Sequence, residues 1–119
     1  MNAWGGISSL QFGLSLMWTQ FQARGLTLND LTRLMCQNTA RFVGLGQRKG
    51  SIAPGFDADL IVWNPEHEFT LEESMIRHRH PVTPYAGQKL RGMVEMTFLH
   101  GNKIYEKGRF LKKTSGGRL

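Results

Sequence analysis

The chain has 119 residues, of which 40% are hydrophobic, and this composition excludes an intrinsically disordered protein. Its net charge of +6 raises nucleic-acid binding as a hypothesis, but five of the fifteen basic residues follow the last acidic residue, Glu106. These five are Lys107, Arg109, Lys112, Lys113 and Arg118. Residues 1–106 therefore hold ten basic and nine acidic side chains, and we interpret residues 107–119 as a basic flexible tail rather than a nucleic-acid arm.

Cysteine usage and hydropathy narrow the class of protein further. Cys36 is the only cysteine, so an intrachain disulfide framework is excluded and a reducing compartment is expected. No apolar stretch approaches the roughly 20 residues that a membrane-spanning helix needs. The N-terminus lacks a basic region followed by an apolar core, so it predicts no signal peptide. We expect an intracellular protein, cytoplasmic by default, without a membrane or nucleic-acid partner.

The first predicted helix begins at Ile7 and ends at Gly25, which we expect to form a left-handed cap. Apolar residues recur along it at helical spacing: Ile7, Leu10, Leu14, Trp18 and Phe21. Three further apolar residues lie off this stripe: Phe12, Leu16 and Met17. A helix that is apolar around most of its surface is normally buried. A chain of 119 residues offers it little to pack against.

Two shorter helices are expected next. Thr27 and Asp30 fit a capping box at the start of the second helix, which we predict to run to about Gln37. Asn38 or Thr39 is expected to cap a third helix that Gly44 closes. The polar bridge that follows, residues 47–50, marks an internal boundary between residues 1–47 and residues 48–106.

After this boundary the pattern changes from helical to extended. A turn over Ala53–Phe56 leads into Leu60–Trp63, an apolar run that we predict to be a strand buried on both faces and stopped by Asn64-Pro65. Glu68–Leu71 is expected to form a short second strand, and Leu71–His78 one or two helical turns.

The last predicted elements form a hairpin. Two prolines make residues 80–85 irregular, and Met93–Leu99 reads as a strand. A turn over His100–Lys103, with Gly101-Asn102 at its centre, returns the chain through Ile104-Tyr105. Helices therefore precede a small sheet, which predicts an α/β fold class.

Three groups of residues are candidates for chemistry. His78 and His80, two residues apart on an extended segment, would point to one side and bind zinc, or they belong to a basic surface segment. Asp57 and Asp59 are either paired carboxylates or acceptors for backbone N–H groups. Cys36 is either a nucleophile or a small buried thiol on a helix face. The residues alone do not choose among these alternatives.

Four runs resemble the allantoinase branch of the amidohydrolase superfamily, whose close relatives include dihydroorotase, hydantoinase and dihydropyrimidinase. Ala3–Gln11 (AWGGISSLQ) resembles the loop and helix after the last barrel strand, and Gly50–Leu60 resembles the superfamily's G-x-I-x-x-G-x-D-A-D signature. Arg77–Gly87 resembles R-H-K-x-S-P-Y-x-G, and Gly101–Tyr105 resembles a hairpin near the family's C-terminus. The resemblance covers about residues 2–110.

This resemblance implies a (β/α)₈ barrel with an added β-sandwich built from both chain ends. In such enzymes two zinc ions, bridged by hydroxide and usually by a carbamylated lysine, attack a cyclic amide. The reaction implied for allantoinases is the hydrolytic ring opening of allantoin to allantoate in purine and ureide catabolism. The family also implies a homo-oligomer and a small cyclic ureide as substrate.

The family's metal ligands, an early HxH, a bridging lysine, two more histidines and an aspartate, belong to segments that this sequence does not resemble. The chain therefore looks like the last quarter to third of an allantoinase. Residues 1–47 would supply closing helices of the barrel, residues 48–106 part of the sandwich, and residues 107–119 the tail. We expect it to be catalytically incompetent alone and to need a missing N-terminal barrel or full-length subunits. The alternative is a non-catalytic module that pairs with full-length subunits.

One part of the substrate site falls within the resemblance. In related hydantoinases the residue before a Gly-Gly pair offers backbone groups to the imide edge of the substrate. By position this implies main-chain contacts from Trp4, Gly5 and Gly6. A turn at the barrel rim without ligand contact is the alternative. No metal ligand and no catalytic side chain are assigned to this chain.

Overall fold

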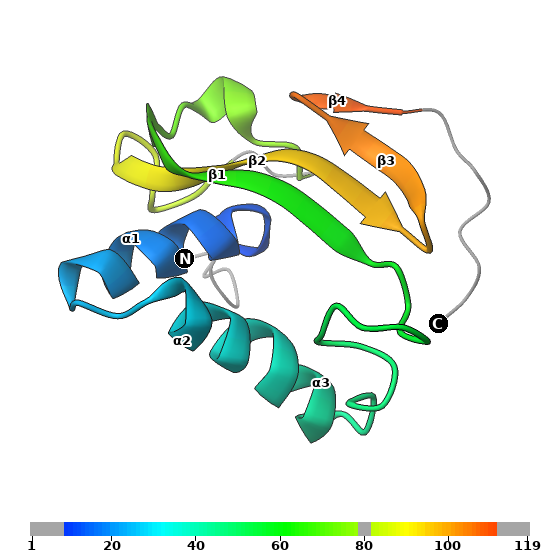
Figure 1. Ribbon diagram of the computed structural model, residues 1–119. Helices are drawn as coiled ribbons and strands as arrows, with labels where there is room; N and C mark the ends of the chain where they lie inside the picture. Colours follow the sequence, from blue (N-terminus) through cyan, green and yellow to red (C-terminus); the bar gives the residue numbers. More distant parts are fainter. Residues whose placement is uncertain (1–8, 79–81, 112–119) are drawn as a thin grey trace, which may run out of the picture.

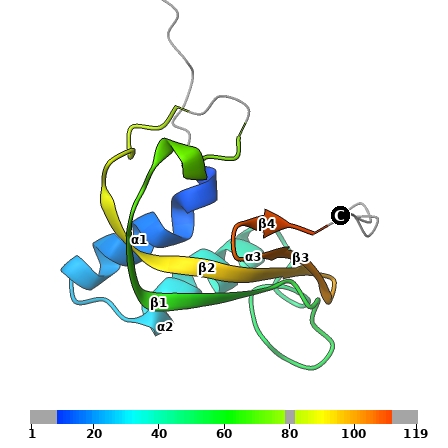
Figure 2. The ribbon, with the colours of Figure 1, turned by 90° about the horizontal axis from the view of Figure 1, so that it is seen from above.

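The computed structural model describes residues 9–78 and 82–111. In this part of the chain two helical segments lie beneath a four-stranded antiparallel sheet, in the order β1-β2-β3-β4 (Figure 1). Viewed from above, the long strands β1 (Leu60–Thr70) and β2 (Lys89–Leu99) cross over the helices (Figure 2). The mixed helix and sheet architecture agrees with the predicted order of elements, helices first and sheet second.

The first helix begins later than predicted. A 3₁₀ turn, η1 (Leu10–Phe12), precedes helix α1 (Gly13–Ala23), and Ile7 lies outside the described residues. The prediction that Leu10 belongs to the buried stripe is wrong, because its side chain is 99% exposed while Phe12 is buried. The tighter 3₁₀ geometry rotates these residues away from the positions that a regular α-helix would give them.

The end of α1 follows the predicted capping pattern. Gly25 has a φ of +71°, the left-handed conformation that was expected there. The Leu26 N–H donates to the carbonyl of Phe21 at 2.9 Å, which is the long hydrogen bond of a Schellman motif. This turn redirects the chain toward the second helix.

The second helical segment begins with the predicted capping box. The Asp30 N–H donates to the Thr27 hydroxyl at 3.3 Å, and the Thr27 N–H donates to the Asp30 carboxylate at 2.9 Å. Helix α2 (Leu28–Thr32) then continues without a break through the π-helical segment η2 (Arg33–Asn38) into α3 (Thr39–Phe42).

The predicted break between a second and a third helix is therefore wrong. Asn38 has helical backbone angles and makes no side-chain cap, and the Thr39 hydroxyl donates back to the carbonyls of Met35 and Cys36 at 2.6 and 3.0 Å. A threonine hydroxyl that bonds to the preceding turn serves the helix interior instead of its start. The π segment thus removes the need for a new N-cap.

Strand β1 differs most from its prediction. It runs through Asn64-Pro65 instead of stopping there, so Glu68–Thr70 belongs to the same strand. Its pairing with β2 is irregular between Asn64 and Glu68. Proline is tolerated because β1 is an edge strand of the described sheet, where a missing N–H removes no ladder bond.

The prediction that the start of β1 is buried on both faces is also wrong. Ile61 and Val62 are 47% and 42% exposed. An edge strand has a neighbour on one side only, so a continuous apolar run does not ensure burial there. The apolar run predicted a strand correctly and its environment incorrectly.

Two tight hairpins complete the sheet. Strands β2 and β3 (Asn102–Glu106) are joined by His100-Gly101, which have φ values of +49° and +77°. Two positive φ values are typical of a type I′ turn, so the turn centre lies one residue earlier than predicted. A second turn leads to β4 (Arg109–Phe110), a short strand within the segment interpreted as a tail.

Helix α1 is attached to the sheet by two hydrophobic clusters. Phe12 packs with Leu71, Ile76 and Leu90, and the 3₁₀ turn η3 (Glu73–Met75) borders this cluster. The second cluster contains Trp18, Phe21 and Leu31, with Trp63 packed against it.

Polar contacts fix the register between α1 and β2. The Arg91 N–H donates to the Thr19 hydroxyl at 2.8 Å, and that hydroxyl donates to the Ser15 carbonyl at 2.7 Å. The Ser15 hydroxyl donates to the Gly92 carbonyl.

None of the helices in the described ranges has the length and apolar character needed to cross a membrane.

Candidate functional site

The predicted substrate-contacting residues, Trp4, Gly5 and Gly6, lie outside the described residues. The structure does join two of the four runs that resemble the allantoinase branch, at their described ends. The Gln11 side chain donates to the Met75 carbonyl and accepts from the Arg77 N–H, each at 2.8 Å. One amide thus joins the end of the Ala3–Gln11 run to the start of the Arg77–Gly87 run.

The candidate histidine pair is only half described. His80 lies outside the described residues, whereas His78 is half-buried and its Nε2 atom is buried without a hydrogen-bond partner among the described residues. Within the same residues, no group of three or more His, Cys, Asp or Glu side chains could hold a metal ion. Among the described residues, His78 therefore lacks the further ligands that a zinc site needs.

The carboxylates of Asp57 and Asp59 do not form a free pair. The Asp57 Oδ2 atom lies 2.8 Å from the Arg48 Nη2 atom and 3.2 Å from the Lys49 Nζ atom. Lys49 also forms an ion pair with the Asp59 carboxylate. The hypothesis of paired catalytic carboxylates is not supported, because both carboxylates form ion pairs with the side chains of Arg48 or Lys49.

The other hypothesis, that these aspartates accept backbone N–H groups, is confirmed for one of them. The His100 N–H donates to Asp59 Oδ1 at 2.9 Å, at the start of the β2–β3 turn. Asp57 uses its side chain for cations, while its own backbone N–H donates to the Arg48 carbonyl at 2.8 Å.

These contacts shift the pKa values of Asp57, Asp59 and Lys49 so that the charged form of each group is favoured. Hydrogen bonds from Arg48 and Lys49 lower the pKa of Asp57, and hydrogen bonds from Lys49 and the His100 N–H lower the pKa of Asp59. The hydrogen bond to Asp59 and, to a smaller extent, that to Asp57 raise the pKa of Lys49. All three groups are therefore held in their charged forms at neutral pH.

Cys36 is exposed, so the expectation of a buried thiol is wrong. It lies in the π-helical segment η2. Partial desolvation raises the pKa of the Cys36 thiol, which disfavours the thiolate. No described contact activates it as a nucleophile.

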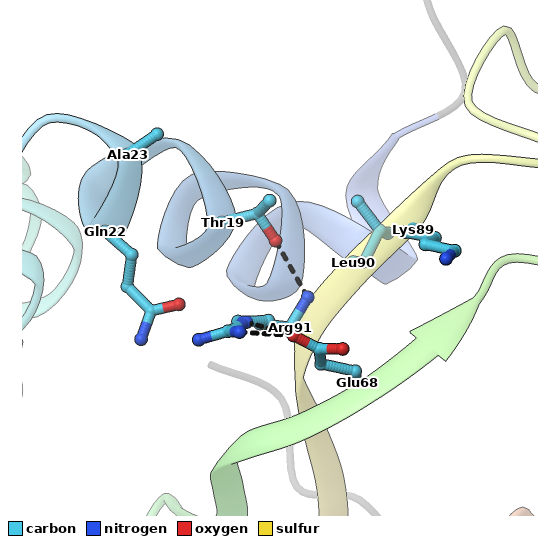
Figure 3. A pocket seen from close by; sticks show the side chains of 7 residues that line it. All are labelled: Thr19, Gln22, Ala23, Glu68, Lys89, Leu90 and Arg91. Atoms are coloured by element: carbon cyan, nitrogen blue, oxygen red, sulfur yellow. Dashed lines mark hydrogen bonds and ion pairs between the residues drawn. The ribbon is translucent and has the colours of Figure 1, made fainter.

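A hollow of about 280 Å³ lies between α1 and the two long strands. Figure 3 shows its lining side chains, which include Thr19 and Gln22 from α1 and Glu68 and Arg91 from the strands. The Arg91 guanidinium is already paired with Glu68, with an Nε–Oε1 distance of 2.7 Å. The hollow's other cationic side chain is Lys89, which has no ion-pair partner among the described residues.

The comparisons with known proteins give the family. The family model described as "Amidohydrolase family" matches residues 5–104. The chain belongs to this family. An allantoinase of Streptomyces avermitilis is 47% identical over 98% of this chain, and a probable allantoinase of Dictyostelium discoideum is 41% identical over all of it. The Saccharomyces cerevisiae allantoinase is 38% identical over 98% of the chain.

Solved structures give the same family context. An L-hydantoinase (dihydropyrimidinase) from Arthrobacter aurescens superposes with a TM-score of 0.85 at 29% identity, over 93% of this chain and 25% of that one. A D-hydantoinase superposes with a TM-score of 0.76 at 27% identity, over 82% of this chain and 21% of that one. The match to the amidohydrolase family and the allantoinase branch confirms the resemblance drawn from the four sequence runs.

The chain spans about a quarter of the length of the curated relatives it matches, namely 26% of the Streptomyces protein, 24% of the Dictyostelium protein and 25% of the yeast protein.

Two residues that form the ion pairs described above were not predicted from the sequence. Lys49 and Arg91 are cations whose partners lie ten and 23 positions away, and no local spacing indicates such pairs.

Proposed function

We propose that this chain corresponds to the C-terminal quarter of an allantoinase-like cyclic amidohydrolase, comprising closing helices of a (β/α)₈ barrel and part of a small β-sandwich. The complete enzyme would open the hydantoin ring of allantoin by hydrolysis to give allantoate, a step in purine catabolism. The observation that carries this proposal is the 47% identity to the Streptomyces avermitilis allantoinase over 98% of the chain.

The proposal includes zinc as the metal of the complete enzyme. Members of the amidohydrolase family are generally metal-dependent. The described residues of this chain do not fit a zinc site, since Asp57 and Asp59 are committed to cations and His78 lacks further ligands. The proposal therefore assigns the metal ligands to the three quarters of the relatives that this chain does not span, and the isolated chain is expected to be inactive.

Exposed apolar side chains along the second helical segment support a partner for this chain. Phe42 and Val43, at the end of α3, are 91% and 63% exposed, and Leu28 and Leu34 are 41% and 45% exposed. We call these four residues the apolar helix surface and propose that they act as one contact region. Clusters of exposed apolar residues mark interaction sites in soluble proteins. In this proposal the surface packs against the remaining barrel.

The proposal is tested by complementation. The chain is purified alone and after co-expression with the part of the Streptomyces avermitilis allantoinase that it does not match. Zinc content and allantoin hydrolysis are then measured for both preparations. We expect neither zinc nor activity in the isolated chain and both in the co-expressed complex. Stoichiometric zinc and ring opening by the isolated chain would overturn the proposal.

A matched pair of variants tests the apolar helix surface. Phe42→Asp places a charge on this surface and is expected to abolish recovery of the complex. Phe110→Asp changes the same residue type at a second exposed position, 68% exposed, in β4 on the opposite side of the molecule (Figure 1). This control is expected to retain most of the complex. Equal loss in both variants would show that the helix surface is not the contact.

The alternative function, a non-catalytic module that pairs with full-length subunits, uses the same surface. It predicts co-purification with an intact amidohydrolase subunit that already carries all its metal ligands. Binding to the intact subunit with no complementation of the truncated one would favour this alternative.

A further inference from the structure

The run Asp57-Ala58-Asp59 carries part of the family resemblance, yet the proposed function assigns it no chemistry. It lies in the long connection between α3 and β1, and its three residues contact Arg48 and Lys49 near the start of that connection and the β2–β3 turn of the sheet. This inference rests on those contacts alone and is independent of the proposed enzymatic function.

On the helix side, a series of backbone hydrogen bonds ties Lys49 to the end of α3. The Leu45 N–H donates to the Ala40 carbonyl at 2.7 Å, and the Lys49 N–H donates to the Leu45 carbonyl at 2.9 Å. Gly50 then passes so close to the helix that a Cβ atom there would lie 2.7 Å from the Cys36 carbonyl oxygen. The position of Lys49 is thus fixed relative to the helix.

On the sheet side, two hydrogen bonds tie the Asp57-Ala58-Asp59 run to the β2–β3 turn. Asp59 accepts from the His100 N–H at 2.9 Å, and the Ala58 carbonyl accepts from the Gly101 N–H at 2.9 Å. The acceptance by a carboxylate also stabilises the positive φ of His100, an uncommon conformation for a residue other than glycine.

Lys49 joins the two sides. Its ammonium group contacts both carboxylates, and its side chain is only 19% exposed, compared with 57% for the neighbouring Arg48. A partly buried lysine shared by two aspartates is screened by salt less than a surface pair.

We propose that Lys49, Asp57 and Asp59 form a charge clamp that fixes the second helical segment to the β2–β3 turn. The clamp makes the relative position of helix and sheet depend on three side chains in a connection that otherwise has no regular secondary structure. Loss of one charge is expected to loosen both ends of the connection while the attachment of α1 to β2 remains intact.

Amide hydrogen exchange by NMR tests the charge clamp in the 119-residue chain. In Asp59→Ala, the His100 amide is expected to exchange about tenfold faster or more, because a hydrogen bond to a charged group is lost. In Asp59→Asn, which keeps an acceptor oxygen but removes the charge, a smaller acceleration is expected. Lys49→Met is expected to accelerate the Leu45 and His100 amides together.

Two internal references and one control variant make the test selective. The Arg91 amide, bonded to Thr19, and the Lys107 amide, bonded to the Glu95 carbonyl, are expected to keep their rates in all three variants. Glu68→Gln breaks the ion pair with Arg91 and is expected to leave His100 unchanged.

The clamp is disproved by an unprotected His100 amide in the wild-type chain or by unchanged His100 exchange in Asp59→Ala. Equal acceleration of the His100 and Arg91 amides would also disprove it, because the substitution would then act through global unfolding.

Discussion

Gly92 in strand β2 offers a quantitative test of how closely helix α1 packs against the sheet. Its φ is +89°, and a Cβ atom there would lie 2.4 Å from Cζ3 of Trp63 and 3.2 Å from Cδ1 of Trp18. The two indole rings meet edge to face with centroids 5.9 Å apart. Gly92→Ala therefore adds backbone strain and forces this tryptophan pair apart.

The two costs of Gly92→Ala are separable. A left-handed φ costs a non-glycine residue about 1–2 kcal/mol, and overpacking a well-packed site costs about 1–3 kcal/mol. The expected loss in the free energy of unfolding is thus about 2–5 kcal/mol, a large share of the about 5–15 kcal/mol by which domains are stable. Gly87→Ala provides the matched control, because its φ is +81° but no atom lies within 4 Å of the added methyl.

Urea unfolding followed by tryptophan fluorescence measures both variants. We expect Gly87→Ala to lose about 1–2 kcal/mol and Gly92→Ala to lose more by the overpacking cost. The reasoning is refuted if Gly92→Ala is no less stable than Gly87→Ala while the dependence of the unfolding free energy on urea concentration is the same for both.

Three further perturbations follow from described contacts. Trp18→Phe removes the indole N–H that donates to the Pro65 carbonyl at 2.9 Å, and we expect about 1–2 kcal/mol lower stability, measured by urea unfolding. Thr27→Ala breaks the capping box and should cost about 1 kcal/mol, with a matching loss of helical circular dichroism on warming. The lowered pKa values of Asp57 and Asp59 mean that their stabilisation is complete above their unfolded pKa of about 3.8 and is lost as pH falls through their lower folded values. Unfolding midpoints measured from pH 6 down to pH 2.5 should therefore fall more steeply for wild type than for a double Asp57→Asn, Asp59→Asn variant.

Local signals in the sequence predicted the helix boundaries that depend on neighbouring residues. The capping box at Thr27 and the left-handed Gly25 were both correct, because each requires only residues within one turn. The break at Asn38 was wrong because a π segment has no simple sequence pattern, and its Thr39 hydroxyl bonds backward instead of starting a new helix.

Features that depend on distant neighbours were less predictable. The apolar run Leu60–Trp63 indicated a strand, but the exposure of Ile61 follows from the edge position of β1, which no residue in the run encodes. The candidate site shows the same division. The sequence indicated Asp57 and Asp59 as candidates because they lie two residues apart, whereas Lys49 joins their cluster only through the fold.

Pro65 has a consequence for self-association that follows from its place in β1. An exposed edge strand of 11 residues is a template on which another copy can add by backbone pairing. Pro65 offers no N–H, and it is followed by Glu66 and Glu68, so the uncharged part of this edge is limited to Leu60–Asn64. The proline therefore interrupts fibril-like growth along β1, where Ile61 and Val62 would otherwise favour it.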